Sequence, residues 1–166
     1  MLEGSIMEYV KWFIGLVSLY FVTMMVVLMF QMNELNTFQQ EVNYQIERHG
    51  GLTEDAMAEL NEFAISRYGG GLVTSNEVGA PCIDGTPADT PSSGFYLHEL
   101  KVDESIDSDY EYILYKRPNS EKARYGTTIR YILSRHVGRF GEGRSFINLS
   151  IIGESASRVR GTASAD

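Results

Sequence analysis

The stretch WFIGLVSLYFVTMMVVLMFQM, residues 12–32, decides the fold of this chain. It contains no charged side chain and a single Gln, and about 20 apolar residues in a helix are enough to cross the hydrocarbon core of a membrane. No Pro or Gly follows until Gly50 and Gly51, so the helix is expected to continue past the apolar stretch. The sequence therefore predicts a membrane-spanning helix that runs directly into a polar one.

The second part of this helix is amphipathic. Apolar residues recur at steps of three and four, and Tyr44 or Gln45 completes the stripe, whose main members are Leu35, Phe38, Val42 and Ile46. One interpretation is that the stripe packs on the chain's own domain. The other is that it packs on neighbouring helices in an assembly, which makes these four residues candidate assembly residues.

The distribution of Lys and Arg around the apolar stretch predicts its orientation. Lys11 precedes the stretch, and no Lys or Arg follows it until Arg48. Because cytoplasmic flanks are enriched in these residues, the amino terminus is expected inside the cell and the rest of the chain outside. A cleavable secretory signal is not expected, since the apolar run is longer than the usual signal core and lacks a basic segment before it.

A second helix is expected after the Gly50-Gly51 pair. Thr53 is a suitable N-cap, Glu54 and Asp55 favour the first turn, and the glycines at 69–71 end the helix. Residues 72–94 contain three of the four prolines, which predicts an exposed, mobile loop with a short strand at residues 72–74.

From residue 95 the apolar period changes to two. Four segments rich in aromatic and β-branched residues predict strands, namely residues 95–102, 110–116, 127–137 and 145–153. Short connections between consecutive strands predict an antiparallel meander. A further short strand at residues 154–160 is possible, and residues 161–166 are expected to be a frayed tail.

The fold class predicted is α+β: a long N-terminal helix, a second helix and an antiparallel sheet of about four strands. The expected segments follow the chain in order: an N-terminal segment (1–11), a transmembrane or filament-core helix (12–32), amphipathic helices (33–71), an exposed loop (72–94), an antiparallel β domain (95–160) and a tail (161–166).

Charge is divided unevenly along the chain. Residues 1–110 carry 4 Lys and Arg against 17 Asp and Glu, whereas residues 111–166 carry 10 against 5. These are either two solvated faces or complementary faces that attract each other between copies. A net charge of −8 argues against nucleic acid as a partner.

A local group of basic residues, Arg130, Arg135, Arg139 and Arg144, has the same two interpretations. They form salt bridges with the domain's own acids, or they contact the acidic helix surface of an adjacent copy.

The sequence offers no catalytic, cofactor or metal site. His49, His98 and His136 lie in unlike contexts, and Cys82 is the only cysteine. Asp107, Asp109 and Glu111 are interpreted as solvated turn charges, because they lack the Gly and distal Glu of a calcium loop. The Asn148-Leu149-Ser150 triplet falls inside a predicted strand, which disfavours glycosylation. No enzymatic activity is expected.

In this layout the chain resembles type IV pilin-like proteins, in particular the pseudopilins of tight-adherence (Tad) systems and the pilin-like membrane proteins of Gram-positive secretion and conjugation clusters. The similarity is carried by Gly4 and Glu8-Tyr9 ahead of the apolar run, and by YGTTIRYIL (residues 125–133) and INLSIIGES (residues 147–155). The resemblance implies that Glu8 and Tyr9 belong to an assembly surface, where the buried Glu8 carboxylate pairs with an amine of a neighbouring subunit.

The function implied is that of a structural subunit of an extracellular pilus or pseudopilus, which is inserted in the cell membrane before assembly. Its expected partners are copies of itself, the membrane, other pilins and an assembly platform. The alternative is a single-pass anchor protein that does not polymerise and whose extracellular domain binds a partner in a secretion or conjugation machine.

Overall fold

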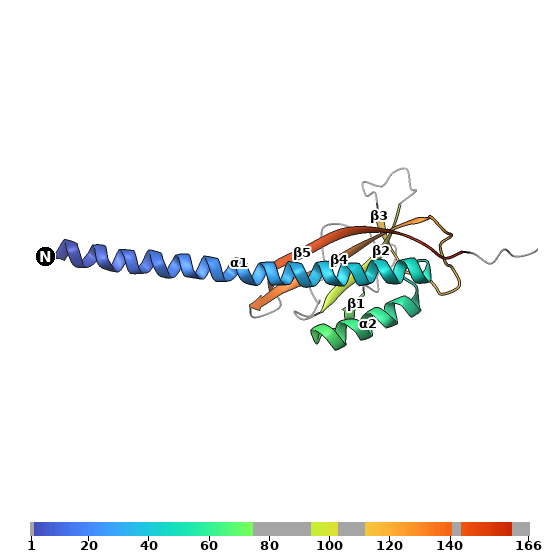
Figure 1. The fold of residues 1–166 in the computed structure, drawn as a ribbon, viewed down its shortest axis with the longest axis horizontal. Helices are drawn as coiled ribbons and strands as arrows, with labels where there is room; N and C mark the ends of the chain where they lie inside the picture. The colour runs from blue at the N-terminus through green and yellow to red at the C-terminus, as the bar shows by residue number, and fades with distance from the viewer. Residues whose placement is uncertain (1, 75–93, 103–111, 141–143, 161–166) are drawn as a thin grey trace, which may run out of the picture. The chain divides into compact units, whose positions relative to one another are not determined.

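The computed structural model describes residues 2–74, 94–102, 112–140 and 144–160. The elements in chain order are α1 (Leu2–His49), α2 (Glu54–Tyr68), β1 (Leu72–Val73), β2 (Phe95–Val102), β3 (Tyr112–Tyr115), β4 (Thr128–Phe140) and β5 (Arg144–Ala156), as labelled in Figure 1. The chain divides into two compact units, residues 1–34 and 35–166, so that α1 contributes to both. The fold class is α+β with a long N-terminal apolar helix, as predicted.

The five strands form one mixed sheet in the order β1-β2-β4-β5. β3 also pairs with β2, so two short strands share one edge of β2. β1 runs parallel to the start of β2, with Leu72 opposite Phe95, whereas β3 runs antiparallel to its end, with Tyr115 opposite Glu99. The predicted short strand after the second helix is confirmed, but its parallel pairing makes the sheet mixed rather than purely antiparallel.

The predicted meander is wrong, because β4 pairs with β2 and not with β3. The chain between β3 and β4 does not turn back beside β3. It is held instead at the end of α1, where the backbone N–H of Ala123 donates a 2.8 Å hydrogen bond to the carbonyl of Gly50. From this anchor the chain continues into β4, which pairs with the other edge of β2. Farther along, β5 extends to Ala156, so the possible strand at residues 154–160 is partly the end of β5.

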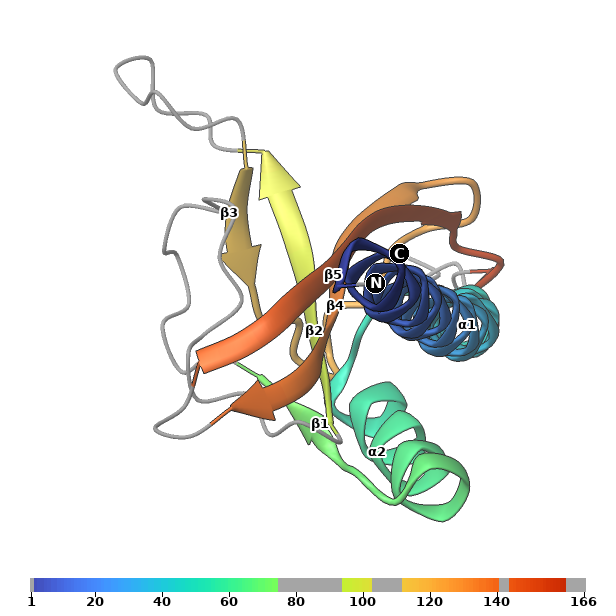
Figure 2. The same ribbon diagram turned by 90° about the vertical axis from the view of Figure 1, so that its left-hand side faces the viewer.

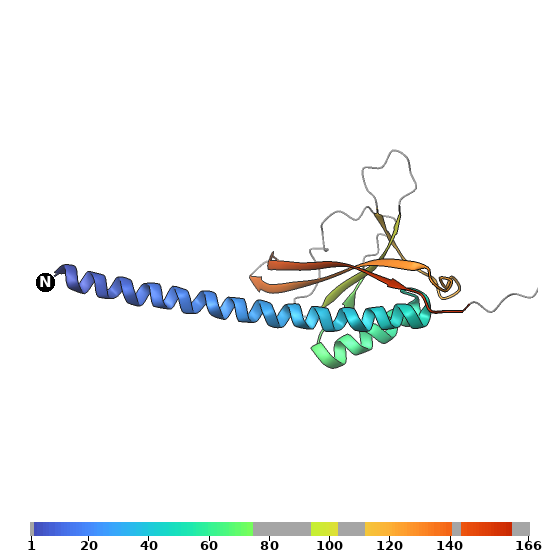
Figure 3. The same ribbon diagram turned by 45° about the horizontal axis from the view of Figure 1, so that its top comes forward.

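The main core lies between one face of the sheet and the two helices. Figures 2 and 3 show α2 and the C-terminal part of α1 on the same side of the sheet. Along β2 and β4, alternate residues point into this layer. The fully buried side chains include Phe38, Val42, Leu60, Phe95 and Leu133. A second, smaller cluster on the opposite face contains Tyr96, Leu100, Leu114 and Ile132.

The ends of α2 follow the sequence signals. Thr53 is the N-cap, and its hydroxyl accepts a hydrogen bond from the backbone N–H of Ala56 at 3.3 Å. Gly69 ends the helix in the left-handed conformation, with φ of 72°, which a residue without a side chain adopts at little cost. Both predictions are confirmed.

Several predictions fall outside the described residues. They concern most of the loop (residues 75–93, which include Cys82), the carboxylates Asp107, Asp109 and Glu111, and the tail at 161–166.

Candidate assembly surface

Between Trp12 and Phe30, the helix of the first unit carries apolar side chains on every side and no charged one. Its large side chains are mostly exposed, for example 72% for Trp12, 67% for Phe13 and 66% for Phe30. The most apolar eighteen-residue window of this helix contains no buried residue. By length and composition the helix is able to cross a membrane. This surface needs an apolar environment that the described chain does not itself supply.

In the second unit, the same helix α1 has a different environment. Leu35, Phe38, Val42 and Ile46 have no exposed surface and belong to the core beneath the sheet. Gln45, and not Tyr44, completes the stripe, since Gln45 is 5% exposed and Tyr44 is 56% exposed. The stripe therefore packs on its own domain, and these four residues do not form a surface for neighbouring copies.

Polar contacts support this packing. The hydroxyl of Tyr131 on β4 donates a 2.6 Å hydrogen bond to Oδ1 of Asn43 on α1. The backbone N–H of Arg158 donates to the carbonyl of Glu47 at 3.1 Å, and Nε of Arg158 lies 3.0 Å from a Glu47 carboxylate oxygen. The C-terminal part of α1 is thus fixed to the sheet by both apolar and polar contacts.

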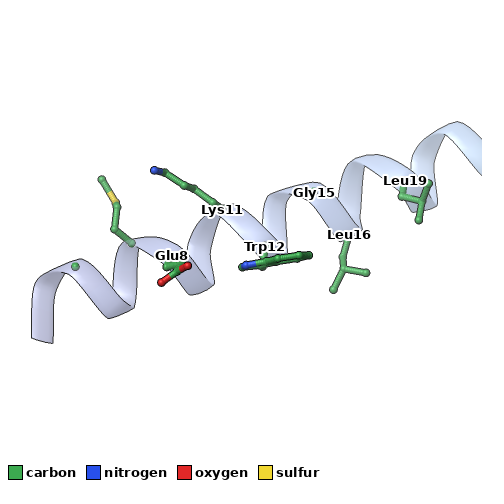
Figure 4. A pocket seen from close by; sticks show the side chains of 8 residues that line it. Glu8, Lys11, Trp12, Gly15, Leu16 and Leu19 are labelled. Atoms are coloured by element: carbon green, nitrogen blue, oxygen red, sulfur yellow. The ribbon is translucent and has the colours of Figure 1, made fainter.

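A shallow groove runs along the first turns of α1. It is lined by Gly4, Met7, Glu8, Lys11, Trp12, Gly15, Leu16 and Leu19. A Cβ atom added at Gly4 or Gly15 would have no neighbour within 4 Å, so the two glycines leave the groove floor open. Figure 4 shows Lys11 on one side of the groove, and Glu8, Trp12 and Leu16 on the other.

Glu8 and Lys11 are the charged residues of this groove. Among the described residues, neither side chain has an ion-pair or hydrogen-bond partner. Tyr9, the other candidate from the sequence, is 76% exposed and does not line the groove. The structure therefore places Glu8, but not Tyr9, beside Gly4 and Lys11.

The basic residues predicted as a cluster are separated by the sheet. Arg130 and Arg135 are five residues apart on β4, so the strand alternation puts them on opposite faces. Arg130 forms an ion pair with Glu154 of β5. Arg135 is only 7% exposed, and its guanidinium lies 4.8 Å from the ring centroid of Phe95. Arg130 and Arg135 therefore do not lie in one basic patch, and Arg130 pairs with an acid of its own domain, as the first of the two interpretations expects.

The other two basic residues lie near the β4–β5 turn. Arg139 is opposite Ser145, and Arg144 is opposite Phe140 in the register of β4 and β5. Their side chains are outside the described part of the structure.

One polar pair was not predicted from the sequence. Glu99, on the core-facing side of β2, is 3% exposed. It accepts hydrogen bonds from Nε of Arg117 at 3.0 and 3.1 Å, and from the backbone N–H of Leu52 at 3.1 Å. The hydrogen bond to Glu99 raises the pKa of Arg117 above its ordinary value. The available signal was the acid at a core-facing position of FYLHELKV, which requires a buried partner.

The described side chains do not assemble a metal site, since no three of their His, Cys, Asp or Glu residues are close enough together. A pocket of about 530 Å³ lies between the start of α2 and the edge of β2. Its cations are engaged: Arg117 with Glu99, and Lys116 with Glu54 at 3.8 Å.

The chain was compared with known proteins. No protein-family model matches it, and no solved structure matches it. It is similar to an uncharacterized protein of Bacillus anthracis (pXO2-21), with 42% identity over 77 residues, which is 46% of this chain and 64% of that protein. The chain therefore spans less than two thirds of the length of this relative.

Proposed function

We propose that this chain is a pilin-like structural subunit. The first unit would hold it in the membrane before assembly and would pack against other copies in the core of an extracellular pilus or pseudopilus afterwards. The second unit would form the outer surface of the filament. Its partners would be copies of itself, other pilins and an assembly platform, and no nucleic acid.

The observation that supports this proposal most strongly is the different burial of the two parts of α1. The apolar stripe from Leu35 to Ile46 is buried in the core of the second unit. The apolar side chains from Ile6 to Phe30 are instead exposed on all sides of the helix. Leaving one large apolar side chain in water instead of burying it costs about 1.5–3 kcal/mol. Both lipid and neighbouring apolar helices would cover such a surface, which suits a subunit that moves from one to the other.

In this role the chain catalyses no reaction. Its buried polar groups hold elements together: Glu99 and Arg117 join β2 to the segment after β3, and Tyr131 joins β4 to α1. With the amino terminus in the cytoplasm, as the Lys and Arg distribution favours, the second unit would lie outside the cell.

The test is to express the full chain in its own cells, shear the surface, and probe both sheared and membrane fractions with an antibody against the second unit. Sheared filaments that contain the chain are the expected result. A chain that is found only in the membrane fraction, as a monomer, would overturn the proposal and favour the non-polymerising anchor protein.

A further inference from the structure

The groove at the start of α1 combines three properties. Its floor is open at Gly4 and Gly15, its walls carry apolar side chains, and it holds one acid and one base without partners among the described residues. Small residues allow two helices in a membrane to approach closely. A single charge that is buried at such a contact without a partner is strongly unfavourable, so an occupant of the groove has to supply complementary charges.

The helical repeat fixes where these charges lie. Lys11 follows Glu8 by three residues, which is about 60° short of a full turn at 3.6 residues per turn, and about 4.5 Å farther along the axis. Gly4 and Gly15 project between these two directions. The glycines therefore form the floor of the groove, with the base on one wall and the acid on the other, as Figure 4 shows for the labelled side chains.

This arrangement is self-complementary for parallel helices. When two identical grooves face each other in parallel, the left wall of one helix meets the right wall of the other. Lys11 of each helix then lies opposite Glu8 of its neighbour, and a Lys side chain is long enough to span the axial offset. Copies of one chain enter a membrane in the same orientation, so a second copy meets the parallel requirement.

We infer that the groove receives the same groove of a second copy of this chain, with Glu8 of each copy paired with Lys11 of the other. This inference rests on the proposed function, since it names the first contact between copies. The inferred contact pairs Glu8 with the Lys11 side chain of the second copy. It therefore differs from a contact in which Glu8 pairs with the amino terminus of a neighbour.

The experiment uses the full chain in bacterial membranes, with Cys82→Ser as background. A cysteine is introduced either on the groove wall (Leu19→Cys) or on the other side of the helix (Val17→Cys), and disulfide-linked dimer is measured after oxidation. Two facing grooves bring the Leu19 positions together and keep the Val17 positions apart. Efficient cross-linking of the first variant alone is expected, and equal cross-linking of both would overturn the inference.

The charge pair is tested in the Leu19→Cys background. Glu8→Lys and Lys11→Glu should each lower the dimer yield roughly tenfold, because each leaves like charges opposed. The double variant Glu8→Lys/Lys11→Glu restores opposite charges and should restore the yield. Failure of the double variant to recover, with normal amounts of chain in the membrane, would overturn the pairing.

The groove floor is tested with a matched pair of substitutions. Gly15→Leu fills the floor and should abolish the cross-link, whereas Val17→Leu, on the other side of the helix, should leave it unchanged. Equal yields from the two variants would contradict the predicted contact.

The failure of this inference can be separated from the failure of the proposed function. Filaments that form normally from both single charge variants would overturn the pairing and leave the function standing. Cross-linked dimers in the membranes of the chain's own cells, together with no chain in the sheared filament fraction, would support the pairing and overturn the function.

Discussion

Arg117 and Glu99 form a buried ion pair at the place where three parts of the second unit meet. Glu99 lies on β2, and Arg117 follows β3 and makes an isolated parallel bridge with Thr53 at the start of α2. The carboxylate also accepts the backbone N–H of Leu52, and Nη1 of Arg117 donates to the carbonyl of Glu121 at 3.0 Å. A side chain at Gly51 would overlap the Arg117 guanidinium, so the glycine makes room for the pair.

We predict that Glu99→Gln destabilises the second unit by about 3 kcal/mol, because it leaves the charge of Arg117 without its counter-ion in a site where that side chain is 14% exposed. Chemical denaturation of the full chain in detergent micelles, followed by circular dichroism, measures the change. Glu47→Gln breaks the exposed pair with Arg158 and should cost less than about 1 kcal/mol. Equal effects of the two substitutions would contradict the role of the buried pair.

Phe38→Ala should destabilise the second unit by about 3–5 kcal/mol, since it empties a fully buried position between α1 and the sheet. The ring stacks on Phe95 with centroids 4.2 Å apart. Tyr44→Ala, on the exposed side of the same helix, should change stability by less than about 0.5 kcal/mol. Hydrogen exchange and thermal unfolding of both variants provide the comparison. If Phe38→Ala leaves the stability unchanged, the amphipathic stripe is not part of the core, and packing of the stripe on neighbouring copies becomes the better interpretation.

Gly153→Ala should cost about 1–3 kcal/mol, because a Cβ atom on β5 would overlap the ring of Tyr131, which lies opposite it on β4. The effect depends on that ring. In a Tyr131→Leu background, the same Gly153→Ala substitution should be nearly neutral. Equal costs in the two backgrounds, measured by a double-mutant cycle of denaturation free energies, would refute this explanation.

Stability should fall at alkaline pH. Burial raises the pKa of Tyr131 above its ordinary value of 10.0, and the hydrogen bond to Glu121 raises the pKa of Tyr115. A raised folded-state pKa gives stability that is complete below the unfolded-state value and is lost as the pH rises through the folded-state value. The free energy of unfolding should therefore decline above about pH 10. Tyr131→Phe should reduce this decline more than Tyr125→Phe, at an exposed tyrosine; identical slopes would remove Tyr131 from the explanation.

Local signals in the sequence predicted most of the elements. The apolar run at 12–32 and the absence of Pro and Gly up to Gly50 predicted one helix, which is α1. Thr53 and Gly69 marked the ends of α2, and the period of two marked β2 to β5. These features depend on residues within a few positions of each other, and for that reason a single sequence is enough to read them.

The candidate site could be predicted only in part. Gly4 and Glu8 were singled out through the resemblance to pilin-like proteins. They join Lys11 and Gly15 in one groove only when the helical repeat is applied to all four residues together. The four stripe residues were correctly recognised as one helix face. Periodicity alone did not decide whether that face meets its own sheet or another copy, because both surfaces are apolar.

The sequence by itself determined that this protein has a helix able to cross a membrane, an amphipathic continuation, a second capped helix and several strands. Only the tertiary structure decided the strand order, in which β3 and β4 both pair with β2, on opposite edges, and the chain between them is held by the distant hydrogen bond between Ala123 and Gly50. It also separated Arg130 from Arg135 and joined Arg117 to Glu99. The physical reason is that burial and charge pairing depend on which residues meet in space, whereas helix and strand patterns depend on neighbours along the chain.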